Sequence, residues 1–260
     1  MKSIHAALLI PVLFSAAAAL KASPINFNFI TSGGVETGTG LTNVRTYTDP
    51  VTLATVTVTG WSVGQGPTDT FSRAQSTFTN GFGLGACSPG TGPTNGVDCS
   101  SPYHQIDNNS HYEFLLFQFS PGVSAVSVTL QSFTCWVVTA CDATKNGRDS
   151  SYFFGTVGSG NLSGVTLGGL GGIGFGVERD NAHTAENSAS TDPAVTQAII
   201  GTTGNALLFG AMIDGAGAGD DFFKIQTLSA NAVPEPATIG MIGVALVAFG
   251  FCRRRSRRGQ

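Results

Sequence analysis

The sequence predicts an all-β protein built as a single β-sandwich, jelly-roll-like in type. Three observations favour this class. Glycine accounts for 35 of the 260 residues, and because each interior glycine costs a helix about 1 kcal/mol relative to alanine, long helices are disfavoured. Only 11% of the residues are charged, which excludes a coiled coil and a charged disordered chain. In the middle of the chain, apolar and polar residues alternate with the period of two that a strand requires.

About ten short strands are expected along residues 23–230, separated by clusters of glycine, proline, asparagine and aspartate. The segment 112–119 is apolar on both faces, which predicts a central strand that is covered on both sides. The expected strands are residues 25–30, 51–53, 56–58, 112–119, 126–130, 133–138, 152–157, 172–177, 206–213 and 222–228.

Two segments between these strands are interpreted differently. Residues 192–200 are expected to form a short helix, with Asp192 as its cap and Pro193 at its first position. The glycine-rich stretch 168–176 contains no regular repeat, so both a flexible loop and a tightly packed strand remain open for it.

The charges divide the chain into an acidic body and a basic end. Residues 23–233 hold six basic and 15 acidic groups, a net charge of −9, while the whole chain carries −3. Binding to nucleic acids depends on lysines and arginines that neutralise phosphates, so the acidic body excludes a nucleic-acid partner. The last eight positions hold five arginines: Arg253, Arg254, Arg255, Arg257 and Arg258.

The first 22 residues are typical of a secretory signal peptide. Lys2 and His5 precede an apolar stretch over residues 6–20, and small residues follow it. This order predicts export and a cut after Ala22 or Ala19. The stretch has no polar face for water, which disfavours the alternative that it is a helix of the folded domain.

A second apolar segment, residues 237–252, lies between Pro234-Glu235-Pro236 and the arginines. As a transmembrane helix its 16 residues would span about 24 Å, slightly less than the ~30 Å hydrocarbon core, and snorkelling arginines with local bilayer thinning make up the difference. Positive flanks stay in the cytoplasm, so the arginines act as a membrane stop and place the body on the other side. The two prolines keep residues 234–236 out of any helix.

The order of Pro-Glu-Pro, short apolar span and arginine-rich terminus resembles the PEP-CTERM sorting tail of Gram-negative bacteria. The resemblance covers residues 233–258. It implies an inner-membrane-anchored precursor, cleavage near the tripeptide by an exosortase, and release or attachment at the cell surface, often alongside exopolysaccharide production. On this interpretation residues 1–22 are a signal peptide, 23–230 an exported domain and 231–260 the sorting tail.

Four of the five cysteines lie in the exported body, in a compartment that permits disulfides. Their proximity along the chain predicts the bonds Cys87–Cys99 and Cys135–Cys141, each worth roughly 2–3 kcal/mol on the chain-entropy account. The other connectivities stay open. A zinc site is disfavoured because no Cys-x-x-Cys pair occurs.

Potential metal ligands gather in residues 104–113. His111 and Glu113 share one face of a strand, and Asp107 and Asn108 in the preceding turn bring oxygens near them. Calcium, which takes six to eight oxygens, is the ion that this set would suit, whereas zinc would prefer the histidines. The alternative is structural: a self-bonded turn followed by a glutamate that opens a buried strand. No other cofactor is indicated.

Two further groups of residues carry weaker hypotheses. Asp220-Asp221 forms a second acidic turn, expected to be solvated rather than a calcium site. Aromatic residues could stack against sugars, but in a sandwich they are more often core. They are Tyr47, Trp61, Tyr103, Trp136 and Tyr152.

The chain contains no Gly-x-Ser-x-Gly, His-Glu-x-x-His, phosphate-loop or EF-hand motif. We therefore expect no enzyme but a structural or adhesive protein of the cell surface or extracellular matrix. Its expected partners are the exosortase, the export machinery, the membrane and exopolysaccharide. Two alternatives remain: a lectin-like, calcium-assisted carbohydrate-binding module, and a secreted carbohydrate-active enzyme that uses two carboxylates.

Overall fold

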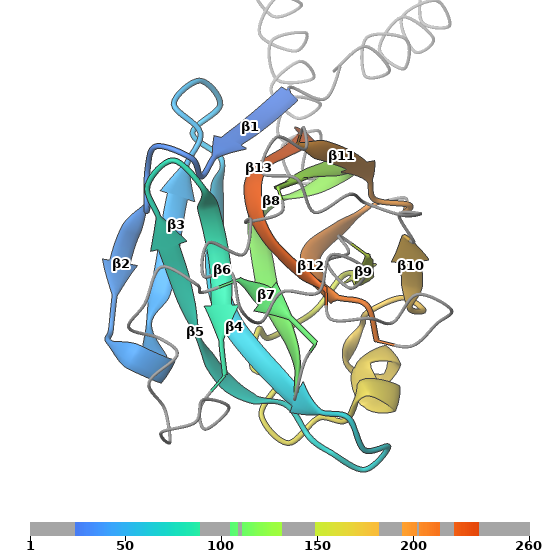
Figure 1. Ribbon diagram of the computed structural model, residues 1–260. Coiled ribbons are helices and arrows are strands. Elements are labelled where there is room, and N and C mark those ends of the chain that lie inside the picture. The colour runs from blue at the N-terminus through green and yellow to red at the C-terminus, as the bar shows by residue number, and fades with distance from the viewer. Residues whose placement is uncertain are drawn as a thin grey trace, which may run out of the picture.

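The computed structural model describes residues 24–88, 105–108, 111–131, 149–181, 194–201, 203–213 and 221–233. Most regular structure in these residues is β, so the all-β prediction is confirmed (Figure 1). The helical segments among them are η1 (Gly40–Thr42) and η3 (Leu167–Ile173), both 3-10. The strands are β1 (Pro24–Asn28), β2 (Val35–Thr37), β3 (Val44–Thr48), β4 (Thr55–Gly64), β5 (Ser72–Thr79), β6 (Gly83–Cys87), β7 (Ile106–Asp107), β8 (His111–Gln131), β9 (Ser150–Gly155), β10 (Arg179–Asn181), β11 (Val195–Ala198), β12 (Gly204–Ala211) and β13 (Phe222–Ala232).

The strands join into one sheet that closes on itself. Strands β4, β8, β13, β6 and β5 each pair with the next, and the pairing of β5 with β4 completes a small barrel. Strands β3 and β2 extend the sheet beyond β4, and β12, β9 and β10 extend it beyond β8. This arrangement differs from the expected jelly roll, which has two separate sheets.

The long strand β8 explains the difference. Its first half pairs with β4 and β12, and its second half pairs with β13 and β11. The predicted strands 112–119 and 126–130 are therefore two halves of one element. Because each half belongs to a different part of the sheet, β8 connects the layers that a sandwich would keep apart.

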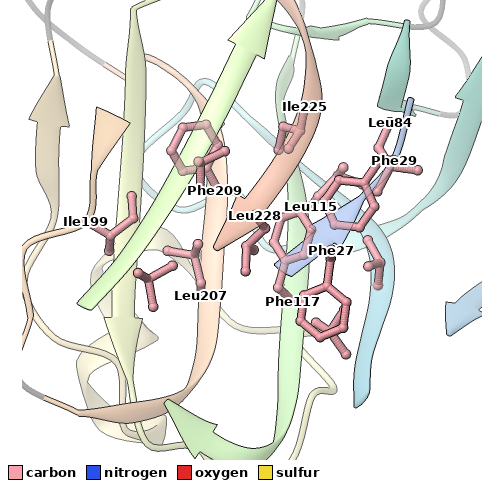
Figure 2. Close-up of a cluster of buried hydrophobic side chains, with 14 of the residues drawn as sticks. Phe27, Phe29, Leu84, Leu115, Phe117, Ile199, Leu207, Phe209, Ile225 and Leu228 are labelled. Carbon is pink, nitrogen blue, oxygen red and sulfur yellow. The ribbon is translucent and has the colours of Figure 1, made fainter. Parts of the chain in front are cut away.

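The prediction that residues 112–119 are covered on both faces is confirmed. Leu115 and Phe117 lie in a larger apolar cluster that also receives Phe27, Phe209 and Ile225, as Figure 2 shows. Phe114 and Leu116 face a second cluster with Trp61, Phe71 and Leu170. The aromatic residues Trp61, Tyr47 and Tyr152 are all buried, so in the described part of the chain the core interpretation of the aromatics is correct.

Three predicted elements are wrong. Residues 51–53 form a turn, because the carboxylate of Asp49 accepts hydrogen bonds from two of their amides. Residues 172–177 overlap the end of η3, whose Leu170 is buried and whose Leu167 and Ile173 pack against the second cluster. Apolar residues there cover a sheet face instead of forming a strand.

Residues 195–198 are strand β11, not helix, because they pair with the second half of β8 and bury Gln197 against Ser150. The expected cap, Asp192, and Pro193 lie outside the described residues, as does the expected strand 133–138. The sequence did not predict strands β2, β3, β5, β6, β7 and β10. All three residues of β2 are exposed, and β7 has two residues.

Candidate functional site

A buried polar cluster lies where β13 begins, around Asn108 and Asp221. The Asn108 side-chain amide donates to the Met212 carbonyl at 3.1 Å and to Asp221 Oδ2 at 3.0 Å, and its oxygen accepts from the Asp221 amide at 2.9 Å. Asp221 Oδ1 accepts from the Asp149 amide at 3.2 Å. Asn108 and Asp221 together thus connect three parts of the chain that are far apart in the sequence: Asn108 itself, Asp149, and residues 212–221.

The environment of Asp221 favours its neutral form. Its side chain is 1% exposed. Burial, and then repulsion from Asp149, raise the pKa of the Asp221 carboxyl to about 8, although hydrogen bonds from the Asp149 amide and Asn108 act in the opposite direction. The expectation that Asp221 sits in a solvated turn is therefore wrong.

A second buried carboxyl group, that of Glu113, opens strand β8 beside this cluster. Glu113 Oε1 accepts from both the amide and the hydroxyl of Ser88 at 2.6 Å, and Oε2 accepts from the Asp107 amide at 3.3 Å. Burial, followed by repulsion from Asp107, raises the pKa of Glu113 well above its usual value. Glu113 therefore ties β8 to the end of β6 and to β7.

Lys224, on β13, is a third buried ionisable group. Its side chain is 1% exposed, and burial lowers its pKa to about 8. Near the start of β13, burial therefore disfavours the charged forms of two acids, Asp221 and Glu113, and of one base, Lys224.

The predicted metal ligands do not meet around one point. Asn108 faces Asp221, and Glu113 faces Ser88 and the Asp107 amide. His111 lies on the same strand as Glu113, and its Nδ1 is buried without a hydrogen-bond partner among the described residues. In that part of the chain no three His, Cys, Asp or Glu side chains are grouped to hold a metal. The calcium site stays a prediction.

Sequence reasoning missed Asp149 as a site residue. It follows a segment of mixed polarity, and only the fold brings it to Asp221. Of the cysteines, Cys87 ends β6 and is buried, whereas Cys99, Cys135 and Cys141 lie outside the described residues. Both disulfide pairings stay predictions.

The first and last described residues of the chain both lie at the C-terminal end of β13. Pro24 of β1 pairs with Asn231 of β13, and the Val233 amide donates to the Gly122 carbonyl at 2.9 Å. Pro234, Glu235 and Pro236 follow Val233 directly in the sequence but, like the arginines of the membrane stop, lie outside the described residues. The tripeptide thus begins two residues after Ala232, the last residue of β13.

Among the residues that the structure describes, no helix has the length and apolar character needed to cross a membrane. The signal peptide and the expected transmembrane helix fall outside these residues, so both stay predictions.

Comparison with known proteins identifies the C-terminus. Residues 232–256 match the PEP-CTERM protein-sorting motif, which confirms the resemblance drawn from the sequence. No curated protein and no solved structure shows significant similarity to the chain. The chain carries a PEP-CTERM sorting motif, which implies an exported protein that an exosortase processes and that is sorted to the cell surface.

Proposed function

We propose that the exported domain is a non-enzymatic structural or adhesive component of the cell surface or extracellular matrix. The observation that carries the proposal is how the buried carboxyl groups are used. Three buried carboxyl groups accept hydrogen bonds from main-chain amides of other segments: those of Asp49, Glu113 and Asp221. Carboxyl groups engaged in this way hold the fold together, whereas a hydrolase needs two that face its substrate.

The packing supports the same conclusion. The larger cluster contains side chains from both halves of β8, and many of its members are phenylalanine, leucine and isoleucine (Figure 2). A densely packed interior with a charge-poor exterior suits a protein that must persist outside the cell. The predicted disulfides Cys87–Cys99 and Cys135–Cys141 would add to this persistence, and intact mass before and after reduction with alkylation tests them.

The experiment incubates the mature protein, purified from its native producer, with the exopolysaccharide of the same cells. We expect the protein to sediment with the polymer while the number of reducing ends stays constant over time. Newly released reducing ends that disappear on a single substitution such as Asp221→Asn, in a variant that still folds, would establish the carbohydrate-active enzyme instead.

The same assay separates the lectin-like alternative. Retention on the polymer that a chelator abolishes and added calcium restores would indicate a calcium-assisted binding module. Retention that a chelator leaves unchanged supports the structural proposal, and no retention at all contradicts the matrix role.

A further inference from the structure

The turn between β3 and β4, residues 49–54, is held in place by one carboxylate. Asp49 Oδ1 accepts from the amides of Val51 and Thr52 at 3.0 and 2.6 Å, and from the Thr52 hydroxyl at 2.8 Å. Asp49 Oδ2 accepts from the amide of Asn26 in β1 at 3.1 Å. Burial acts to raise the pKa of Asp49, but these hydrogen bonds outweigh it and lower the pKa. The turn is therefore rigid and fixed to β1.

This rigid turn exposes apolar side chains. Val51 is 86% exposed and Leu53 is 73% exposed. Leu53 also has a φ of +59°, in the left-handed region that disfavours a leucine and that asparagine or glycine would occupy more easily. A leucine that is both solvent-exposed and held in an unfavourable conformation suggests a function rather than a contribution to stability.

The turn lies beside the exit of the sorting tail. Thr55, just after the turn, pairs with Ser120 of β8, and Gly122, two residues further on, accepts from the Val233 amide. Figure 1 shows the loop between β3 and β4 next to β1, at the same end of the molecule as the end of β13. The exposed apolar residues are therefore neighbours of the chain's two exits.

The tail is too short to hold this end far from a bilayer. Three residues separate Val233 from Ala237, where the apolar segment begins, and four steps of extended chain reach about 14 Å at most. We propose that Val51 and Leu53 form a membrane-docking surface, which contacts the headgroup region of the bilayer while the sorting tail anchors the precursor. The proposal rests on the membrane-anchored precursor that the sorting motif implies.

Charge favours this end over the rest of the body. Residues 23–233 carry a net charge of −9, so most of the domain is repelled by anionic headgroups. In the turn the one charged residue, Asp49, is buried, and Pro50 adds another exposed apolar ring. The domain therefore meets the bilayer with a turn whose one charged group is buried and whose most exposed side chains are apolar.

Depth-dependent fluorescence quenching tests the proposal. The full-length chain carrying Leu53→Trp is reconstituted through its tail into phosphatidylethanolamine/phosphatidylglycerol vesicles, with and without brominated acyl chains. The matched control is Val177→Trp. Val177 is 75% exposed, close to the value for Leu53, and its neighbour Gly176 donates to the Phe154 carbonyl of β9, a strand that does not pair with β1 or β13. After subtraction of the emission that Trp61 and Trp136 give in the parent chain, we expect bromine to quench the tryptophan at position 53 at least twofold more than the tryptophan at position 177.

Flotation of the vesicles separates the two hypotheses. Protein that floats with the vesicles while positions 53 and 177 are quenched equally would overturn the docking surface and leave the anchor intact. Protein that does not float would overturn both. A third outcome concerns the exosortase. If aqueous quenchers are kept from position 53 solely when an exosortase is reconstituted in the same vesicles, the turn contacts the enzyme and not the lipid. A flexible twelve-residue insertion after Val233 is expected to abolish the difference between the two positions.

Discussion

The two ends of β13 differ in which side chains are buried and which are exposed. At its start, polar side chains are buried: Asp221 accepts hydrogen bonds from the Asn108 side chain and the Asp149 amide, and burial favours its neutral form. At its end, apolar side chains are exposed, and Val51 and Leu53 stand on a turn that a buried aspartate holds. The first arrangement joins distant segments of the fold, but it disfavours the charged form of the buried carboxyl group. The second leaves apolar surface in water, which does not stabilise the fold.

The comparison teaches where stability and function reside in this domain. Substitutions at the start of β13 should change the free energy of unfolding. Substitutions at its end should change processing or membrane contact and leave the fold intact or more stable. Four predictions test this division, from the largest expected effect to the smallest.

The largest effect is expected just beyond the end of β13. Replacing Pro234, Glu235 and Pro236 with alanine removes the rigid extended segment that the sorting motif contains. In a host with the matching exosortase we expect the full-length membrane-bound precursor to accumulate and the mature form to disappear, as measured by fractionation and C-terminal mass mapping. Pro67→Ala, at an exposed position, is the control. Normal maturation of the triple variant would refute the role of the tripeptide.

At the start of β13 the largest effect is expected from Asn108→Ala. It removes two donated hydrogen bonds and one accepted bond, and leaves buried partners on Met212 and Asp221 unsatisfied. We expect a loss of about 3 kcal/mol in the free energy of unfolding, measured by urea denaturation. Asn161→Ala, which removes one exposed hydrogen bond, should cost less than about 0.5 kcal/mol. Equal costs for the two variants would mean that the cluster does not hold the fold.

Asp221 should make stability depend on pH. Its pKa is raised from the usual 3.8 to about 8 in the folded state, so between these values the folded chain binds a proton that the unfolded chain has lost. Stability from this group is complete below about pH 4 and declines as pH rises to about 8, by at most about 1.4 kcal/mol per pH unit. Asp221→Asn should flatten this decline in urea melts at a series of pH values. Asp69→Asn, at an exposed turn, is the matched control, and parallel profiles for all three proteins would contradict the assignment.

The alternation of residue types predicted the fold correctly where it matches the alternation of buried faces along a strand. The alternating faces of residues 112–119 match two real clusters, since Leu115 and Leu116 pack into different cores. Periodicity failed where tertiary pairing decides the conformation. Val195 and Thr196 are a strand because β8 offers an unpaired edge, and Leu53 is in a turn because Asp49 binds its neighbours. Nothing within either segment encodes those partners.

The candidate site shows the same limit. Asp107, Asn108 and Glu113 could be selected from the sequence because they are close along the chain, and their structural alternative, a turn before a buried strand, describes Glu113 well. Asp149 and Asp221 could not be joined to them, because Asn108 is 113 residues from Asp221. Contacts at such separations depend on the closure of the barrel, which local patterns do not specify. The sorting tail was predictable because its function depends on a linear order of residues.

The smallest expected effect concerns Leu53 itself and sharpens the contrast between the two ends. Leu53→Asn should raise the free energy of unfolding by about 0.5–1 kcal/mol, because asparagine tolerates a φ of +59° better than leucine does. In a chain that carries Val51→Trp as the reporter, the same substitution should reduce quenching by brominated lipid, because it removes an apolar side chain from the headgroup region. Val177→Asn, the control, should leave the quenching unchanged. A gain in stability together with a loss of lipid contact would show that the leucine is retained for its surface; a loss in both would instead mean that Leu53 serves the fold.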